Sequence, residues 1–451
     1  MSYSNVPDSV AHFDNNVNLP LPNGDYVMYN RNGSGKPIVL SGVALEVYRC
    51  LTNGIPTDIV RMSHPELEKT WDENLRTMVE FFSQERLVSS VVGTTSIRAP
   101  TSKPRKFIAL WIHVTDACNL RCSYCYVRKG KRHLTEKTCH EIVDALQCDV
   151  TYGGVTEIEL RFAGGEPLAN FGVVTYLSQL AKQTFEPQGV KVRLDIVTNA
   201  TLVTDRIADT LKSMGFRVMV SLDGLGEYND ARRFVNGRVS AARVLRGLDI
   251  LTRVGIRPTV LTTISDQSVQ GLWDLSRFLA SRNLQLSLSL SRDYKAPQGL
   301  TMNAGLVGAS TVEFLNRVTR LPDAELPKIS FNGVVFAGRR SSICSAGRNF
   351  YAVDPVGNVC FCQMTIDKPL GSVSNGRGIL EFSGEVDKMT KGGECIECTW
   401  GDVCCSGCGV LAEQAGTTGR ASVMCSLMKQ ILPSILTYEG RKIQKEQVKL
   451  P

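Results

Sequence analysis

The sequence lacks the features of a membrane-spanning, secreted or nucleic-acid-binding protein. No apolar run approaches the roughly 18 residues that a membrane span needs. The N-terminus, with Asp8, His12 and Asp14, has no charged stretch followed by an apolar one, as a signal segment would. The net charge of +7 is mild for 451 residues, and it is not clustered like a nucleic-acid footprint. We therefore expect a cytoplasmic protein of two or three domains, with no membrane or nucleic-acid partner.

Cysteine, by contrast, is abundant, with 15 residues. Without a secretory signal, this number argues for metal binding rather than for disulfides. Cys118, Cys122 and Cys125 have the spacing C-x3-C-x2-C and follow an apolar, strand-like segment over 107–114. Zinc or a fully protein-bound iron–sulfur cluster would take four ligands, so three thiolates leave one iron of a cubane open for chemistry. The alternative is a set of three structural or redox cysteines.

The first 92 residues predict a small unit of their own. After a polar segment over 1–20, a hairpin over 26–40 precedes a helix that begins at Ser41 and ends at Asn53-Gly54. A second helix over 72–85 and a strand over 87–92 complete a hairpin–helix–helix–strand order, which is a winged-helix pattern. We place this domain at 21–92. Residues 93–106 form a linker by composition, with four cations and no acid.

From residue 107 to about 330, strands and helices alternate. The expected strands are 107–114, 157–162, 191–198, 216–222, 258–264 and 285–291, and the expected helices are 135–148, 172–184, 204–215, 240–254 and 271–283. Alternation of this kind predicts an α/β fold with a parallel sheet, built as a partial barrel of about six β/α units. In such folds the site lies at the carboxyl ends of the strands.

Several polar segments end these strands. Gly164-Gly165-Glu166-Pro167 follows the second strand, Asn199 ends the third, Ser221 and Asp223 end the fourth, and Arg233 comes shortly after. With the cysteine loop, these segments resemble the radical S-adenosylmethionine (SAM) enzymes. The resemblance implies a [4Fe–4S] cluster on Cys118, Cys122 and Cys125 that binds SAM. It places the SAM amino group at Gly164, Gly165 and Glu166, the ribose near Ser221 and Asp223, and the carboxylate near Arg233, with Asn199 as a further contact. Ordinary helix caps or surface salt bridges are the alternative for these residues. The family often has glycine where Ala200 stands.

A second cysteine set lies over 335–430. Its members are Cys344, Cys362, Cys395, Cys398, Cys404, Cys408 and Cys425. The order resembles the SPASM extension, which holds two auxiliary [4Fe–4S] clusters. By that resemblance Cys344, Cys362 and Cys408 hold cluster I, and Cys395, Cys398, Cys404 and Cys425 hold cluster II. The fourth ligand of cluster I is Cys360 or Cys405, or that iron stays open. A zinc ribbon is disfavoured, because its two C-x2-C pairs lie roughly 15–20 residues apart, whereas Cys395/Cys398 and Cys405/Cys408 are much closer.

Two features narrow the substrate. The sulfatase-maturing relatives have an acid after the last cluster I cysteine, whereas this chain has Gln363 after Cys362, which argues against formylglycine formation by that route. Asp293, Tyr294 and Asp354 remain as proton acceptors. The N-terminal unit resembles the element that captures leader peptides of ribosomally made natural products by adding a strand to a sheet edge. A DNA-binding winged helix is disfavoured because the helix over 72–85 carries four acids against Arg76 alone. A purely structural cap is the other alternative.

Together the resemblances imply a radical SAM–SPASM peptide maturase. We expect it to form a C–C or thioether crosslink in a precursor peptide, with a flavodoxin- or ferredoxin-like protein as electron donor. Auxiliary clusters that accept an electron favour this net oxidation over epimerisation. The alternatives are a radical SAM enzyme acting on another substrate and a non-enzymatic iron–sulfur electron carrier or regulator.

Overall fold

The computed structural model describes residues 16–88, 106–291, 302–336, 344–382, 394–404, 410 and 424–447. Its N-terminal part is an antiparallel sheet in the order β1-β2-β3, followed by helices. The strands are β1 (Asn16–Pro20), β2 (Tyr26–Asn30) and β3 (Ile38–Leu40), and the helices are α1 (Gly42–Asn53), α2 (Asp58–Ser63) and α3 (Trp71–Gln84). The expected hairpin and both expected helices are present. β1 was not predicted, since its sequence Asn-Val-Asn-Leu-Pro is short and polar.

The α1 helix ends where the sequence predicts. Gly54 is its C-cap and has a φ of +65°, a left-handed conformation that glycine adopts without strain. Apolar side chains of β2, α1 and α3, among them Met28, Leu45, Trp71 and Phe82, form a separate small core. The N-terminal part therefore has a hydrophobic core of its own. Residues 89–92 of the predicted last strand lie outside the described residues.

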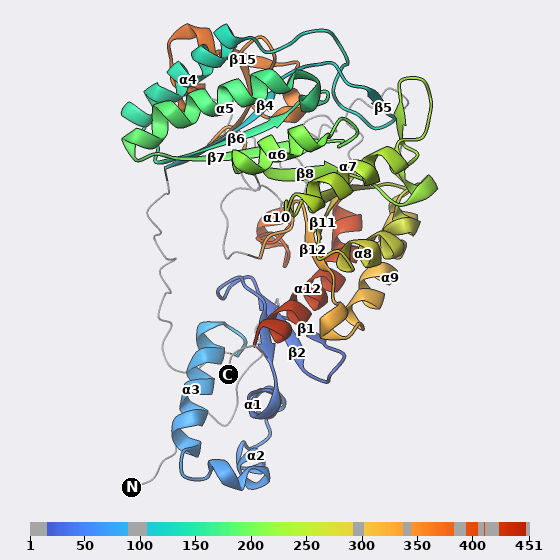
Figure 1. The fold of residues 1–451 in the computed structure, drawn as a ribbon. Helices are drawn as coiled ribbons and strands as arrows, with labels where there is room; N and C mark the ends of the chain where they lie inside the picture. Colours follow the sequence, from blue (N-terminus) through green and yellow to red (C-terminus); the bar gives the residue numbers. More distant parts are fainter. Residues whose placement is uncertain are drawn as a thin grey trace.

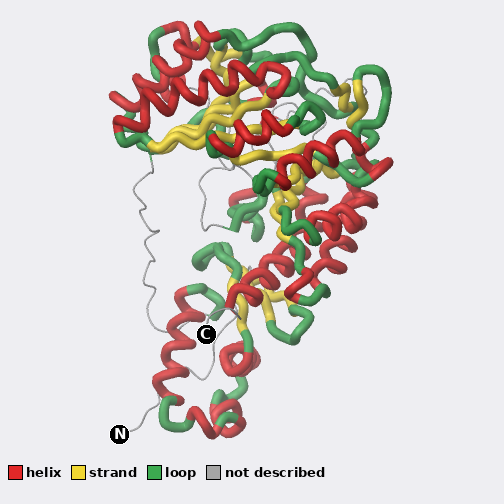
Figure 2. Tube along the Cα trace, in the orientation of Figure 1, coloured by secondary structure: helices red, strands yellow, loops and turns green. Residues whose placement is uncertain are grey.

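A ten-stranded sheet forms the body of the molecule, with the order β12-β11-β10-β8-β7-β6-β4-β13-β14-β15. The six predicted strands are confirmed as β4 (Phe107–His113), β6 (Glu157–Ala163), β7 (Lys191–Thr198), β8 (Arg217–Ser221), β10 (Thr259–Ile264) and β11 (Gln285–Leu290). They pair in parallel, and β12 (Lys328–Phe331) adds a seventh parallel strand beside β11. Helices follow the strands and flank the sheet, as the red and yellow tubes of Figure 2 show. They are α4 (Glu136–Thr151), α5 (Phe171–Phe185), α6 (Asp205–Ser213), α7 (Ala241–Arg253), α8 (Leu272–Ala280) and α9 (Ala304–Thr319).

The two faces of the parallel strands differ in chemistry. On β4, Ile108, Leu110 and Ile112 belong to the large core that includes buried side chains of the flanking helices. Alternate residues of a strand point to the opposite face, and there Trp111 and His113 neighbour Arg161 and Ala163 of β6. The inner face of the sheet is therefore partly polar. The carboxyl ends of its strands lead into the segments that the sequence predicts to be functional.

The C-terminal region extends the same sheet rather than forming a detached layer. β13 (Phe350–Val353) pairs in parallel with β4, and β14 (Asn358–Cys360) and β15 (Pro369–Ser372) continue antiparallel. The short α10 (Glu394–Glu397) and the long α12 (Cys425–Gln447) follow. Figure 1 shows α12 beside α9 and beside β1 and β2 of the N-terminal sheet, which it contacts. In the described residues, no helix is long and apolar enough to cross a membrane.

Candidate metal and cofactor centre

The three cysteines of the first loop lie together beyond the carboxyl end of β4. Cys118, Cys122 and Cys125 are half-buried. The thiols of Cys118 and Cys125 are close enough to Cys122 to raise its pKa. Burial is the larger cause and brings the pKa of Cys122 to about 11, while the charge of Arg232 lowers it. The Lys129 ammonium lies 3.1 Å from the Cys125 sulfur. The charge of Arg232 lowers the pKa of Cys122 and that of Lys129 lowers the pKa of Cys118, each in part, which favours the thiolate forms that iron binding requires.

The Gly-Gly segment after β6 packs directly against this loop. The Gly165 amide donates to the Thr115 carbonyl at 2.6 Å, and the Glu166 amide donates to the Ala117 carbonyl at 2.8 Å. A Cβ atom at Gly165 would overlap the Ala117 carbonyl, and Gly164 has a φ of +114°. Glycine is therefore needed at these two positions first of all because the segment approaches the cysteine loop closely.

Glu166 is buried and holds the end of β7. Its carboxylate accepts hydrogen bonds from the Thr198 hydroxyl at 2.5 Å, the Asn199 amide at 2.8 Å and the Leu168 amide at 3.2 Å. Burial raises the pKa of Glu166, and these hydrogen bonds lower it in part. The Asn199 side chain donates in turn to Asn119 of the cysteine loop at 3.0 Å. Predicted residues from two strands and the loop are thus brought together.

The turn after Asn199 keeps a left-handed backbone without a glycine. Ala200 has a φ of +56° and is fully buried. This is the conformation that favours glycine, which explains why the family often has glycine here. With alanine at position 200, the turn keeps the backbone conformation that a glycine would adopt.

A buried network beside Cys122 includes two residues that sequence reasoning did not select. The Tyr124 hydroxyl donates to Asp223, and the Arg232 guanidinium donates to Tyr124 at 2.6 Å and lies 3.9 Å from Asp223. Asp223 was predicted in the site. Arg232 sits on β9 (Arg232–Phe234), which pairs antiparallel with β5 (Leu120–Cys122) so that Arg232 faces Cys122. Its Nε is buried and has no hydrogen-bond partner among the described residues.

Arg233, which the resemblance placed at the SAM carboxylate, points elsewhere. Its side chain is 45% exposed, against 10% for Arg232. It is paired with Asp230 at 2.6 Å and donates to the Gly237 carbonyl at 3.2 Å. The alternation of β9 turns neighbouring side chains to opposite sides, so only Arg232 reaches the loop. Arg232, and not Arg233, is therefore the arginine beside Cys122. Ser221, the last residue of β8, is half-buried next to β10.

The chemistry of this loop fits a cluster that the protein holds by three thiolates. A cavity of about 470 Å³ adjoins the loop and is lined by Asp116, Arg121, Cys122, Ser123, Cys125, Tyr126, Val127, Arg128, Lys129, Arg132, Met364, Ile366 and Asp367. The thiols, the cations around them and the unpaired Arg232 Nε suit an anionic group with open coordination. In the described part of the chain, no three His, Cys, Asp or Glu side chains group as ligands of a single metal ion.

Cys362 of the second cysteine set lies near the first loop. Tyr126, which follows Cys125, packs against the small core that contains Cys362, and the charges of both thiols raise its pKa after the effect of burial. Cys362 is buried and Cys344 is exposed. Cys360 is fully buried, its sulfur lies 3.5 Å from the Ile366 carbonyl, and burial raises its pKa to about 12. Cys405 and Cys408 lie outside the described residues, so the choice of fourth ligand stays a prediction.

The other predicted groups have defined places. Cys395 and Cys398 are half-buried, Cys404 is buried, and Cys425 begins α12. Among the proton acceptors, Asp354 is paired with Arg132 at 3.2 Å and accepts the amides of Val356 and Asn358, which is a structural role. Asp293 and Tyr294 lie outside the described residues.

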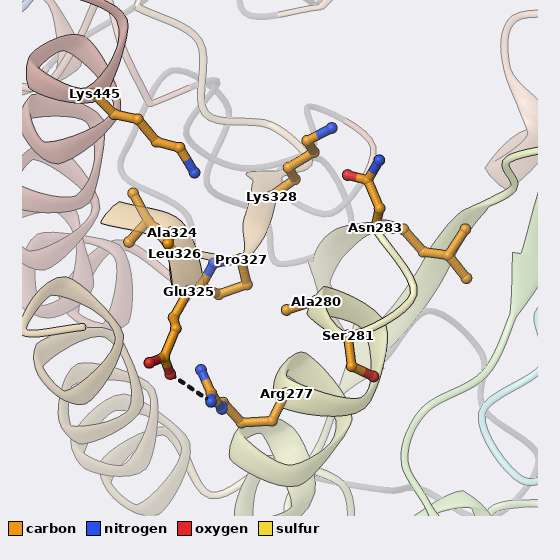
Figure 3. Close-up of a pocket in the computed structure, with 11 residues that line it drawn as sticks. Arg277, Ala280, Ser281, Asn283, Ala324, Glu325, Leu326, Pro327, Lys328 and Lys445 are labelled. Carbon is orange, nitrogen blue, oxygen red and sulfur yellow. Dashed lines mark hydrogen bonds and ion pairs between the residues drawn. The ribbon is translucent and has the colours of Figure 1, made fainter. Parts of the chain in front are cut away.

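A smaller hollow lies at the other end of the parallel strands. Figure 3 shows this cavity of about 240 Å³, which adjoins the amino ends of β11 and β12 and includes Lys328 and Lys445 in its lining. Glu325 is ion-paired there with Arg277 at 2.7 Å. The cysteine loop follows the carboxyl end of β4, so this cavity is separate from the thiol site.

The chain is similar to known proteins over the region that carries the cysteine loop. Residues 112–279 match the Radical SAM superfamily. GTP 3',8-cyclase of Alkaliphilus oremlandii is 32% identical over 165 residues, covering 36% of this chain and 48% of the cyclase. The serine-type anaerobic sulfatase-maturating enzyme of Klebsiella aerogenes is 26% identical over 215 residues, 46% of this chain and 53% of that enzyme. The chain spans 40% to 63% of the length of the first three curated relatives that it matches.

Two solved structures share the fold. The structure of anSMEcpe with bound AdoMet and Cp18Cys peptide has a TM-score of 0.64 and 17% identity, and the match covers 76% of this chain and 99% of that one. Streptococcus suis SuiB bound to the precursor peptide SuiA has a TM-score of 0.53 and 15% identity over 92% of this chain and 99% of that one. The family match lies across the sheet and the cysteine loop, so residues 112–279 are similar in sequence to the Radical SAM superfamily.

Proposed function

We propose that this protein is a radical SAM enzyme that modifies a ribosomally made precursor peptide by forming a C–C or thioether crosslink between side chains. The observation that carries the proposal is the loop with Cys118, Cys122 and Cys125, which is held against Gly165 and Arg232 and has Cys362 of the second set packed near it through Tyr126. A radical SAM domain implies one [4Fe–4S] cluster and SAM. When bound, they supply a 5'-deoxyadenosyl radical that abstracts a hydrogen atom from the substrate.

The residues of the chain orient SAM in this proposal. Glu166 is buried at the ends of β6 and β7, where its carboxylate can accept from the SAM amino group. Arg232 replaces Arg233 as the partner of the SAM carboxylate, because its free Nε donor lies in the buried network beside Cys122. Asp223 holds Arg232 and Tyr124 in place, and Ser221 is expected near the ribose.

The second cysteine set supports an oxidation. After hydrogen abstraction, the substrate radical must form the new bond and lose one electron and one proton, which completes the loss of two hydrogen atoms. The proposed auxiliary clusters, on Cys344, Cys362 and Cys408 and on Cys395, Cys398, Cys404 and Cys425, would accept the electron, and the proton would pass to solvent. Tyr126, next to Cys125 in sequence, packs against the small core that contains Cys362, so one cysteine of the second set lies near the first loop. Epimerisation returns a hydrogen atom and needs no such acceptor, so it ranks second.

Gln363 separates this proposal from formylglycine formation. It follows Cys362 where the sulfatase-maturing relatives have an acid, and its side-chain oxygen is buried without a hydrogen-bond donor among the described residues. A carboxamide cannot take a proton at neutral pH, so we do not propose sulfatase maturation by that route. The GTP cyclase relatives keep a small-molecule substrate as the second candidate.

A leader peptide is proposed to bind the N-terminal sheet. β2 is the central strand, and β3 is an edge strand with a short, partly exposed apolar sequence, Ile-Val-Leu. An edge of this kind can accept an added strand. The neighbour SuiB was solved with its precursor peptide.

Coexpression with a short peptide encoded beside the gene tests the proposal. A crosslink removes two hydrogen atoms from the peptide, and reduction of disulfides does not reverse this mass change. In tandem mass spectrometry the peptide resists fragmentation between the two joined residues. An unchanged mass with a D-amino acid would point to epimerisation. SAM cleavage without any peptide product would favour a small-molecule substrate. The absence of SAM cleavage would favour the interpretation of the protein as a non-enzymatic electron carrier.

A further inference from the structure

The N-terminal sheet touches the segment that carries Cys395, Cys398 and Cys404. The ring of Tyr29, on β2, stacks on Trp400 with 5.6 Å between centroids and 5° between planes. Phe336 also contacts the Tyr29 ring in a T-shaped arrangement, with 5.8 Å between centroids and 77° between planes. Tyr29 is fully buried and Trp400 nearly so, so this is a desolvated contact between two parts of the chain that are far apart in sequence.

Arg31 continues this contact with a charge. Its guanidinium donates to the main-chain carbonyl of Cys398 at 2.5 Å and lies 3.7 Å from the carboxylate of Asp402. The side chains of Arg31 and Asp402 are only 13% and 8% exposed. A cation this deeply buried interacts with nearby charges far more strongly than a surface arginine does.

The cysteine segment is folded tightly around the same carbonyl. The Gly401 amide also donates to the Cys398 carbonyl at 2.8 Å, and a Cβ atom on Gly401 would overlap the carbonyl oxygen of Cys395. The Cys404 amide donates to Trp400 at 2.8 Å. Cys398 is therefore fixed from inside its own segment by Gly401 and from outside by Arg31.

We propose that Arg31 is a positioning residue of the metal centre formed by Cys395, Cys398, Cys404 and Cys425, so that the N-terminal unit forms one wall of that centre. This inference rests on the proposed auxiliary cluster. A cluster held by four thiolates is anionic, and a buried cation bonded beside one ligand stabilises its more reduced state and slows ligand release. Because coupling between two sites is reciprocal, the metal centre also stabilises the docked position of β2.

The test uses the full-length chain with Cys118, Cys122 and Cys125 replaced by alanine, so that iron remains only in the second cysteine set. Arg31→Gln removes the charge, Arg31→Lys keeps it without the planar fork, and Arg76→Gln changes an exposed arginine of α3 as a control. Each protein is reconstituted without oxygen and titrated potentiometrically with EPR detection, and the loss of iron to a chelator is timed.

We expect Arg31→Gln to lower the reduction potential of one cluster and to speed its loss to the chelator by about tenfold or more. Arg31→Lys should fall between, and Arg76→Gln should match the parent. Removal of the metal from the parent should also increase hydrogen exchange in β2.

Equal potentials and equal loss rates in Arg31→Gln and Arg76→Gln would overturn the inference while leaving the auxiliary clusters in place. A parent that binds no iron overturns the proposed clusters themselves. If Arg31→Gln does not fold, Arg31→Lys decides by the same two measurements.

Discussion

The guanidinium of Arg232 lies 2.6 Å from the hydroxyl of Tyr124, which joins β9 to the residue before the third cysteine of the loop. Beside Asp223, Arg232 is buried and Tyr124 is half-buried, and the pairing of β5 with β9 brings Arg232 opposite Cys122. This contact holds a cation at the cysteine loop.

Replacement of Arg232 should be far more harmful than replacement of its neighbour. Arg232→Gln leaves the buried Asp223 without its cation and should lower the free energy of unfolding by about 3 kcal/mol. Arg233→Gln removes an exposed pair and should change it by less than about 0.5 kcal/mol. Denaturant titration of the metal-free chains measures both.

SAM binding gives a second measurement on the same pair. In the reconstituted protein, calorimetry should show at least a tenfold loss of affinity for Arg232→Lys and little change for Arg233→Gln. The reverse order would restore the assignment of Arg233 to the SAM carboxylate.

Iron content should report both cysteine sets. We expect about twelve iron atoms per reconstituted chain, as three cubanes. The Cys118/Cys122/Cys125→Ala triple variant should lose about four of them and keep the rest. A chain that holds only four iron atoms, or holds zinc in the second set, would contradict the auxiliary clusters.

SAM cleavage should separate the roles of the two sets. Under dithionite, Cys122→Ala should form no 5'-deoxyadenosine, because it removes a ligand of the proposed SAM-binding cluster. Cys398→Ala should still cleave SAM but yield no crosslinked peptide. Chromatography of nucleoside and peptide products measures both, and loss of cleavage in Cys398→Ala alone would contradict the division of roles.

Leader binding should depend on β3. Val27, which pairs with Val39, is buried in the central strand, so it cannot offer a free edge. Alternate residues of β3 direct their amides outward, so one of Ile38→Pro and Val39→Pro should remove an outward donor and weaken leader binding, while the other disrupts pairing with β2. Fluorescence anisotropy with labelled leader, run beside a thermal melt, distinguishes them. Unchanged affinity in both stable variants would argue for a structural cap.

Asp149 gives the fold a pH dependence. It is buried on α4, accepts the amides of Ile379 and Leu380, and burial raises its pKa to about 6. The folded chain therefore holds this proton more tightly than the unfolded chain, and the contribution to stability is full below about pH 4 and is lost as the pH rises through 6. The difference between parent and Asp149→Asn should vary by on the order of 1–3 kcal/mol over this range, whereas exposed Asp144→Asn should show no such slope.

Much of the fold followed from sequence, because local signals specify it. The six parallel strands are apolar segments between amphipathic helices, and Gly54 marks the end of α1 through its backbone alone. The cysteine loop was found because its spacing is local too. The pairing of β13 with β4 was not predicted, since it joins residues more than 200 positions apart.

Arg232 was missed for a similar reason. Two adjacent arginines look alike in sequence, and only the register of β9 against β5 decides which one faces Cys122. The contact of Arg31 with Cys398 also depends on how distant segments pack, which no local pattern reveals.

The pairing of β13 with β4 has a consequence for any shortened form of this protein. β4 reads Phe-Ile-Ala-Leu-Trp-Ile-His, and β13 covers the side of it that β6 leaves unpaired. A chain cut before residue 344 would expose this apolar strand along its whole edge, where a second copy could pair with it. We therefore expect the C-terminal region to protect the edge of β4 from intermolecular pairing, and we expect its removal to reduce solubility before it affects any other property.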